Sequence, residues 1–283
     1  MSQTVTRTAA GPRPGAVINL ASVPRPSATF AVWSSAWLAG SAAPDDVLDA
    51  LAPWADAHDV VAADEPSAAA TDLPLPGAPV SSLTFLFAAL RRAPRGPARL
   101  VLTAPGDIRG LPGPGPFGSA VIAAGEGVLF AEAGIGVVPS IIADGVLRWT
   151  VFAVPGPVAP AEYVPIGEAE AELRSQVRES TSLLTELGVA RHRPGVREEI
   201  AAALRARPAS HWPGGMPGRA LRVLQQADEV EAILAAALVD EPGGALTASA
   251  ATARREALRP LETAVRIARR AAVAEAVRTY VPA

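Results

Sequence analysis

The chain has 283 residues with a formal net charge of −3, and 49% of its residues are hydrophobic, which excludes a wholly disordered protein. It contains no cysteine, and all 25 basic residues are arginine, which excludes disulfides, cysteine metal ligands and lysine-dependent chemistry such as Schiff-base formation. No stretch has the apolar length of a membrane span, and the N-terminus lacks the apolar core of a signal peptide. We therefore expect a cytoplasmic protein without membrane contact.

A polar tail over residues 1–15 precedes a region in which strand and helix patterns alternate. Glycine, proline and acidic residues separate these patterns, as is typical of loops and helix starts. The expected elements are, in order, strands at 16–20 and 29–33, a helix at 44–57, a strand at 60–61, an acidic connector at 64–79, a helix from Ser81 or Ser82 to about Arg92, and a strand at 99–103.

After a loop rich in glycine and proline, the patterns of three further strands follow at 128–132, 137–142 and 146–154. Asp144-Gly145 between the last two is a strong hairpin signal, because such turns favour a positive φ. Residues 16–160 are therefore expected to form a mixed α/β domain, with a mixed β-sheet covered by helices.

From residue 161 onward the apolar residues repeat at helical spacing. The stripes lie at 166–187, 196–204, 221–238 and 258–277, and Pro260 is expected to break or kink the last helix. Since an amphipathic helix is stabilised mainly by burial of its apolar face, these stripes should pack on one another. The sequence thus predicts an all-helical region over residues 161–283.

The loop at 105–118 is the candidate ligand site. It follows a predicted buried strand, and open α/β sheets place ligands at the carboxyl ends of their strands. Exposed backbone N–H groups together with an arginine could hold a carboxylate or phosphate there. In the alternative interpretation, the loop is a rigid connection in which Asp107 and Arg109 only pair with neighbours. The candidate ligand-binding residues are Asp107, Arg109, Gly110, Gly113, Glu126 and Arg148.

No motif in the sequence points to catalysis or a cofactor. A Gly-x-Ser-x-Gly elbow is absent, and Glu126 and Glu132 are the candidate carboxylate pair for acid–base work. His58 lies near Asp56 and Asp59, but neighbouring positions do not all face one ion, and metal sites need three or four ligands. We therefore predict no metal and no cofactor, and we favour a non-catalytic protein.

Charge segregation is the most unusual feature of the sequence. Residues 26–90 contain eight acidic residues and no arginine, whereas residues 254–278 contain seven arginines and three acids. Such blocks can steer a protein partner or a second copy of the chain. Nucleic acid is disfavoured, because the net charge is negative and no aromatic residue interleaves the basic run. The residues expected to bind a partner are Arg255, Arg259, Arg266 and Arg270.

Two functions remain open at this point. The first is a non-catalytic interaction or accessory protein with segregated acidic and basic surfaces. The second is a protein or enzyme that binds a small anionic ligand through the loop at 105–118. The two would differ in whether Asp107, Arg109, Glu126 and Arg148 converge on one apolar pocket.

Overall fold

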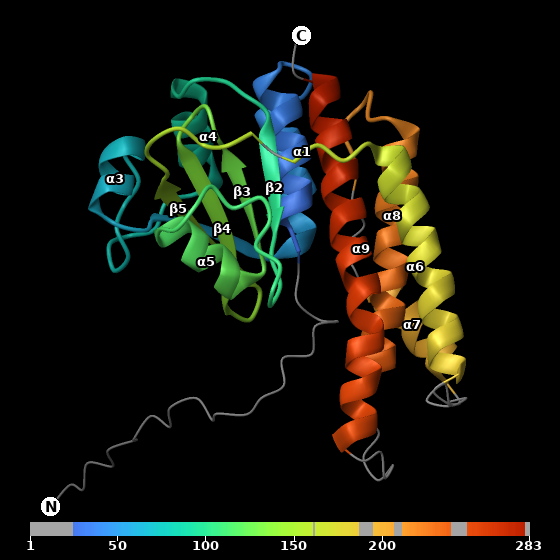
Figure 1. The fold of residues 1–283 in the computed structure, drawn as a ribbon. Coiled ribbons are helices and arrows are strands. Elements are labelled where there is room, and N and C mark those ends of the chain that lie inside the picture. Colours follow the sequence, from blue (N-terminus) through green and yellow to red (C-terminus); the bar gives the residue numbers. More distant parts are fainter. Residues whose placement is uncertain (1–24, 161, 187–194, 207–210, 239–247, 281–283) are drawn as a thin grey trace, which may run out of the picture.

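The computed structural model describes residues 25–160, 162–186, 195–206, 211–238 and 248–280. A β-sheet with covering helices lies beside a group of long helices (Figure 1). The predicted fold class, a mixed sheet with helices followed by a helical C-terminal region, is thus confirmed.

The sheet has five strands in the order β1-β5-β4-β3-β2. β1 pairs with β5 in parallel and the other pairs are antiparallel, so the sheet is mixed. The hairpin predicted at Asp144-Gly145 joins β4 to β5, with Gly145 at φ +67° and a register shift near its start. The strands are β1 (Ala57–Ala62), β2 (Ala98–Leu102), β3 (Glu126–Phe130), β4 (Ile135–Ala143) and β5 (Val146–Ala153).

Short helices connect the first strands. The predicted helix at 44–57 stops early, because Pro53 lies in a 3₁₀ turn (Ala52–Trp54) that follows α2. The connector at 64–79 contains a helix that the sequence analysis missed. Asp64 caps it by accepting a hydrogen bond from Ser67 N at 2.9 Å. These helices are α2 (Pro44–Leu51), α3 (Glu65–Thr71), α4 (Leu83–Arg92) and α5 (Pro116–Ala124).

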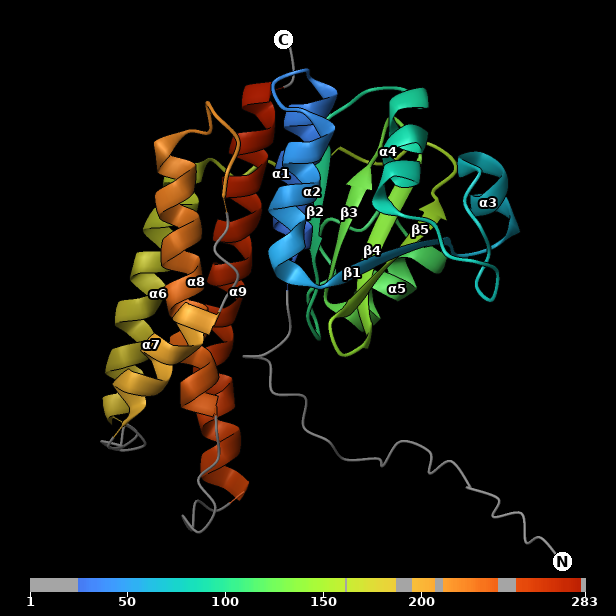
Figure 2. The same ribbon diagram turned by 180° about the vertical axis from the view of Figure 1, so that it is seen from behind.

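The strand predicted at 29–33 is wrong, since these residues lie inside α1 (Ser27–Leu38). α1 lies between the sheet and the C-terminal helices (Figures 1 and 2), and ten of its residues are buried. A helix buried on all sides shows no amphipathic period, so its β-branched and aromatic residues resemble a strand. The strand predicted at 16–20 lies outside the described residues.

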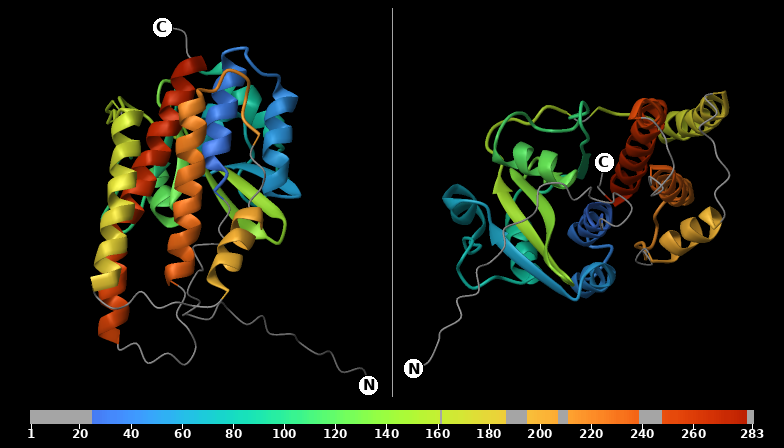
Figure 3. Two further views of the ribbon diagram at one scale, coloured as in Figure 1. Left: turned by 90° about the vertical axis from the view of Figure 1, so that its right-hand side faces the viewer. Right: turned by 90° about the horizontal axis from the view of Figure 1, so that it is seen from below.

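The C-terminal region consists of long helices that pack side by side (Figure 3). α9 contacts α6, α8, α1 and β2, which confirms that the apolar stripes pack on one another. The predicted break at Pro260 is absent, since α9 continues through this residue. Leu258 and Leu261, before and after the proline, are both buried, so both parts of the helix pack on the core. The helices are α6 (Ile166–Glu186), α7 (Val196–Ala206), α8 (Gly218–Leu238) and α9 (Ala248–Tyr280).

One hydrophobic core runs through both regions. Phe30 of α1 packs on Trp149 of β5 at a ring distance of 4.9 Å, and the same cluster includes Leu173 of α6 and Val273 of α9. A smaller cluster lies on the other face of the sheet, under α5. The helices therefore share a core with the sheet through α1, and the boundary expected at residue 160 stays a prediction.

Candidate functional site

The residues predicted to form a ligand site do not converge. Asp107, Arg109, Gly110 and Gly113 lie in the loop between β2 and α5. Glu126 is buried at the start of β3, where it faces the beginning of α1. Arg148 of β5 pairs with Asp59 of β1, with 3.2 Å between Nη2 and Oδ2. The six candidates are therefore divided among three places.

The loop carries its own anion. The carboxylate of Asp107 accepts two hydrogen bonds from Arg109, at 2.8 Å from Nε and 3.0 Å from Nη2. Arg266 of α9 donates to the same carboxylate at 3.2 Å. These bonds, chiefly those from Arg109, hold the pKa of Asp107 well below its usual range. Arg109 is thus already neutralised, which favours the structural interpretation of the loop.

The arginines of α9 hold this loop from the other side. Arg259 Nη2 donates to Pro105 O at 3.4 Å, and Arg270 Nη1 donates to Arg109 O at 3.0 Å. Gly106 has φ +80°, so a side chain there would strain the backbone, and an added Cβ would also displace the guanidinium of Arg259. The sequence analysis treated loop and arginines as separate sites, whereas the structure brings them together.

Of the four arginines expected to bind a partner, Arg259, Arg266 and Arg270 therefore contact the loop of their own chain. Arg255 is exposed and makes no ion pair with the described residues.

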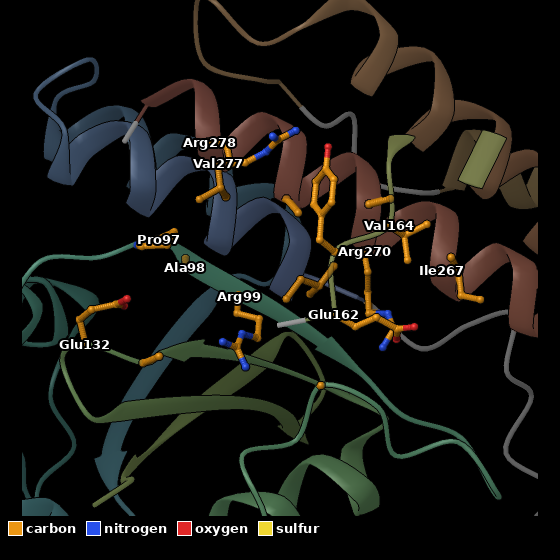
Figure 4. A pocket seen from close by; sticks show the side chains of 16 residues that line it. Pro97, Ala98, Arg99, Glu132, Glu162, Val164, Ile267, Arg270, Val277 and Arg278 are labelled. Carbon is orange, nitrogen blue, oxygen red and sulfur yellow. The ribbon is translucent and has the colours of Figure 1, made fainter. Parts of the chain in front are cut away.

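A pocket of about 270 Å³ opens beside this contact, between the edge strand β2 and α9 (Figure 4). We call it the β2–α9 pocket. The segment 162–164 forms a third wall, and Gly110 closes the end next to the loop. Its apolar lining consists of Pro97, Ala98, Leu100, Ala131, Val164, Ile267, Ala271, Ala274 and Val277.

Two half-buried arginines interrupt this apolar lining. Arg99 Nη1 donates to Ala159 O at 3.0 Å, and Arg270 makes the single bond to Arg109 O described above. In the described part of the chain no carboxylate lies within ion-pair distance of Arg270. Burial lowers the pKa of Arg270 and of Arg99. Asp107 and Glu162 act on Arg270, and Glu132 on Arg99, in the opposite direction from beyond ion-pair distance. The pocket thus presents guanidinium groups that are partly desolvated and that touch no carboxylate of the described residues.

The rim of the pocket carries further charges. Arg278 lies 5.0 Å above the ring of Tyr163, a cation–π arrangement, and pairs with Glu275. Glu162 is exposed beside Tyr163, and Glu132 is exposed next to β3. The carboxylate of Glu132 occupies the position that a side chain at Gly96 would take. The rim is therefore mixed in sign, and of the arginines that line the pocket Arg270 is the one that contacts the loop.

Glu126 and Glu132 do not form a catalytic pair, because Glu126 begins β3 and Glu132 follows the other end of that strand. Glu126 instead caps α1 by accepting a hydrogen bond from Ser27 N at 3.1 Å. Burial raises the pKa of Glu126 to about 7, although Arg25, the hydrogen bonds of Ser27 and Arg269 act in the opposite direction. Its role in this fold is structural.

His58 also has a structural environment. Trp149 Nε1 donates to His58 Nδ1 at 3.1 Å, which leaves the proton on Nε2, 3.1 Å from Leu51 O. No group of potential ligands that could hold a metal ion is found within the described ranges. The two bonds fix the neutral tautomer of the ring.

Stability should consequently fall in mild acid through His58. Burial lowers the pKa of His58, so the contribution of the neutral ring is present above its ordinary value of 6.5 and is lost as the pH falls through the lowered value. His58→Asn keeps an acceptor for Trp149 but does not titrate. We expect the advantage of the wild type over this variant in urea unfolding to shrink between pH 7.5 and pH 5. An advantage that is constant with pH would contradict the assignment.

Comparison with known proteins identifies the family of this chain. The family model of the Rv1486c-like protein N-terminal domain matches residues 27–163, and that of the C-terminal domain matches residues 167–270. The chain belongs to the Rv1486c-like family. Both matched domains contribute to the β2–α9 pocket, since β2 lies in the first, and Ile267 and Arg270 lie in the second.

Two similar proteins come from mycobacteria. The uncharacterized protein Rv1486c of Mycobacterium tuberculosis (strain ATCC 25618 / H37Rv) is 39% identical over 281 residues, which cover 88% of this chain and 96% of the relative. The uncharacterized protein ML1804 of Mycobacterium leprae is 32% identical over 286 residues, with the same coverage of both chains. No solved structure is significantly similar to this chain.

The sequence analysis missed Arg99 and the segment 162–164. Arg99 stood out only as a single charge inside an apolar strand, which is a weak signal because strand residues alternate between two environments. The segment 162–164 has no periodic pattern, and only the fold shows that it runs past the edge strand.

Proposed function

We propose that this protein binds a small anionic ligand with an apolar body in the β2–α9 pocket, without catalysing a reaction. The observation that carries the proposal is the half-buried guanidinium of Arg270, which faces an apolar cavity and touches no carboxylate in the described part of the chain.

The energetics favour such a ligand. A buried charge is costly unless it is paired, and an arginine that lacks a paired anion is the exception in protein interiors. A carboxylate or phosphate on the ligand would provide the pair, with planar guanidinium geometry suited to two hydrogen bonds. The apolar walls would contribute affinity through burial of the ligand body.

The position of the pocket supports the same function. Ligand sites occur preferentially at domain interfaces, and this pocket is built from residues of both family domains. Its volume of about 270 Å³ is at the lower end for ligand sites, so the ligand should be small.

Replacement of Arg270 should abolish this binding selectively. In Arg270→Gln the affinity for a carboxylate or phosphate ligand should fall by at least about tenfold, because hydrogen bonds to charged groups contribute roughly 1.5–3 kcal/mol. Arg255→Gln removes the same charge from the exposed face of α9 and should bind as the wild type does. A thermal-shift screen of alkyl and aryl carboxylates and phosphates, followed by calorimetric titration, provides the measurement. If no compound raises the melting temperature of the wild type, the proposed function is wrong.

An interaction with a protein partner or a second copy is the second candidate. Asp45, Asp49 and Glu65 are exposed and make no ion pair within the described residues, so this part of the acidic block has no counter-charge in contact. The arginines of α9 have less support as a partner surface, because three of the four expected to bind a partner contact the loop of their own chain. No helix among the described residues is long and apolar enough to cross a membrane. The cytoplasmic location stays a prediction.

A further inference from the structure

The pocket wall formed by β2 is an unpaired strand edge. β2 is the last strand of the sheet order and pairs only with β3. Thr103 N donates to Gly125 O at 3.0 Å, one step beyond the register pair Leu102 and Glu126. Along an antiparallel strand, the N–H and C=O groups of successive residues point to alternate edges. Arg99 and Val101, like Thr103, therefore direct their N–H and C=O groups toward β3. Ala98 and Leu100 then direct their N–H and C=O groups away from the sheet.

These outward groups belong to residues that line the pocket. Ala98 and Leu100 are 4% and 5% exposed, and no hydrogen bond joins their backbone to another described residue on that side. The opposite wall carries Ala271 and Ala274 of α9, whose methyl groups cannot donate or accept a hydrogen bond. Buried backbone groups are almost always paired, so this edge lacks an amide partner.

The guanidinium of Arg270 lies at the carboxyl end of β2. An added Cβ at Gly110 would lie 3.7 Å from Arg270 Nη1 and 3.8 Å from Val101 Cγ1, which places the guanidinium beside the second half of β2. Val277 and Arg278 lie near Pro97 and Ala98, at the other end (Figure 4). α9 and β2 therefore run in opposite directions along the pocket.

We propose that the ligand is an N-acyl amino acid, bound as a short extra strand on the edge of β2. Its amide N–H donates to the outward C=O of Ala98, and its carboxylate accepts from Leu100 N–H and from Arg270. The acyl C=O, which is trans to the amide N–H, points away from β2, and the side chain and acyl group lie against the apolar walls. This inference rests on the proposed function. Strand addition uses main-chain hydrogen bonds for affinity and pockets for side chains for selectivity.

A single acylated residue fits better than a longer peptide. The pocket volume of about 270 Å³ is small, and the segment 162–164 closes one side of the strand edge. A longer peptide would have to displace that segment, whereas one acylated residue needs only the part of β2 from Ala98 to Leu100.

The test uses the full chain and four probes in calorimetric titration. N-acetyl-L-leucine carries the amide, the carboxylate and an apolar side chain. Its methyl ester lacks the charge, N-acetyl-N-methyl-L-leucine lacks the amide donor, and 4-methylpentanoate lacks the amide altogether. We expect each of the three altered probes to bind at least about tenfold more weakly, since each loses a hydrogen-bonded group. Arg270→Gln should lower the affinity for N-acetyl-L-leucine, and Arg255→Gln should not.

Hydrogen exchange provides an independent readout. N-acetyl-L-leucine should slow exchange of the Leu100 amide, which donates to the ligand carboxylate, and should leave the Ala98 amide, which gains no acceptor, unchanged. If 4-methylpentanoate binds as tightly as N-acetyl-L-leucine, the acylamino-acid assignment is overturned while the proposed function stands. Tighter binding of a pentapeptide that ends in leucine would overturn the assignment to a small molecule. Failure of every probe, together with a screen without hits, would overturn both proposals.

Discussion

Arg269→Ala should lower the free energy of unfolding by about 3–5 kcal/mol, the largest single effect we expect from a charged residue. The side chain of Arg269 is 5% exposed, and its guanidinium pairs with Asp228 and, at 3.2 Å, with Glu231, both on α8. Burial lowers the pKa of Arg269, but the two carboxylates outweigh it and raise the pKa. Removal of the arginine takes one cation away from both carboxylates and leaves Glu231, which is 17% exposed, with its pair to Arg25 at 3.2 Å.

Chemical denaturation of the full chain measures this effect, and Arg269→Met provides a matched control. Methionine fills much of the same volume without a charge. Arg269→Met should therefore cost less stability than Arg269→Ala if packing contributes, and as much if the lost ion pairs dominate. A loss below about 1 kcal/mol in Arg269→Ala, the level of an exposed ion pair, would contradict the structure of this cluster.

Glu126 should make the protein less stable as the pH rises toward 8. Its pKa is raised by burial to about 7, above an ordinary value of 4.5. Its stabilising contribution is therefore fully present below pH 4.5 and is lost as the pH rises through 7. The whole change is on the order of 3 kcal/mol, from the size of the pKa shift.

The matched variant is Glu126→Gln, which keeps an acceptor for Ser27 N and does not titrate. Its stability relative to the wild type should rise by about 3 kcal/mol between pH 4.5 and pH 8.5, measured by urea unfolding at each pH. Glu132→Gln, which removes an exposed carboxylate after the same strand, is the control for the loss of one negative charge. A relative stability of Glu126→Gln that is the same at both ends of the pH range would show that Glu126 titrates normally.

Local patterns were sufficient for most of the fold. The helical spacing after residue 165 predicted α6 to α9, because each of these helices has one apolar face and a polar one. Asp144-Gly145 predicted the hairpin, since Gly145 alone of the two needs a positive φ. The prediction failed for a helix that is buried on all sides and therefore has no polar face. α1 is buried from every direction, so nothing in its sequence distinguishes a helix from a strand.

The candidate site depended on contacts that no local pattern carries. Pairing of Asp107 and Arg109 with neighbours was one of two interpretations of the loop, but the sequence could not show that the partners are each other and Arg266, over 150 residues away. Arg270 was predicted to bind a protein partner from its position in a basic run. Its actual surroundings, an apolar pocket and a backbone carbonyl, arise only because α9 packs against the edge of β2.

The most direct test of ligand binding through Arg270 is an NMR titration that observes the arginine side chains of the full chain. The Arg270 Nε–H signal, assigned by its loss in Arg270→Gln, should move saturably as a carboxylate hit is added. The signal of Arg269, which is already paired with Asp228 and Glu231, should stay in place. Movement of Arg255 and other exposed arginines without saturation, and with Arg270 unchanged, would contradict a ligand site in the β2–α9 pocket.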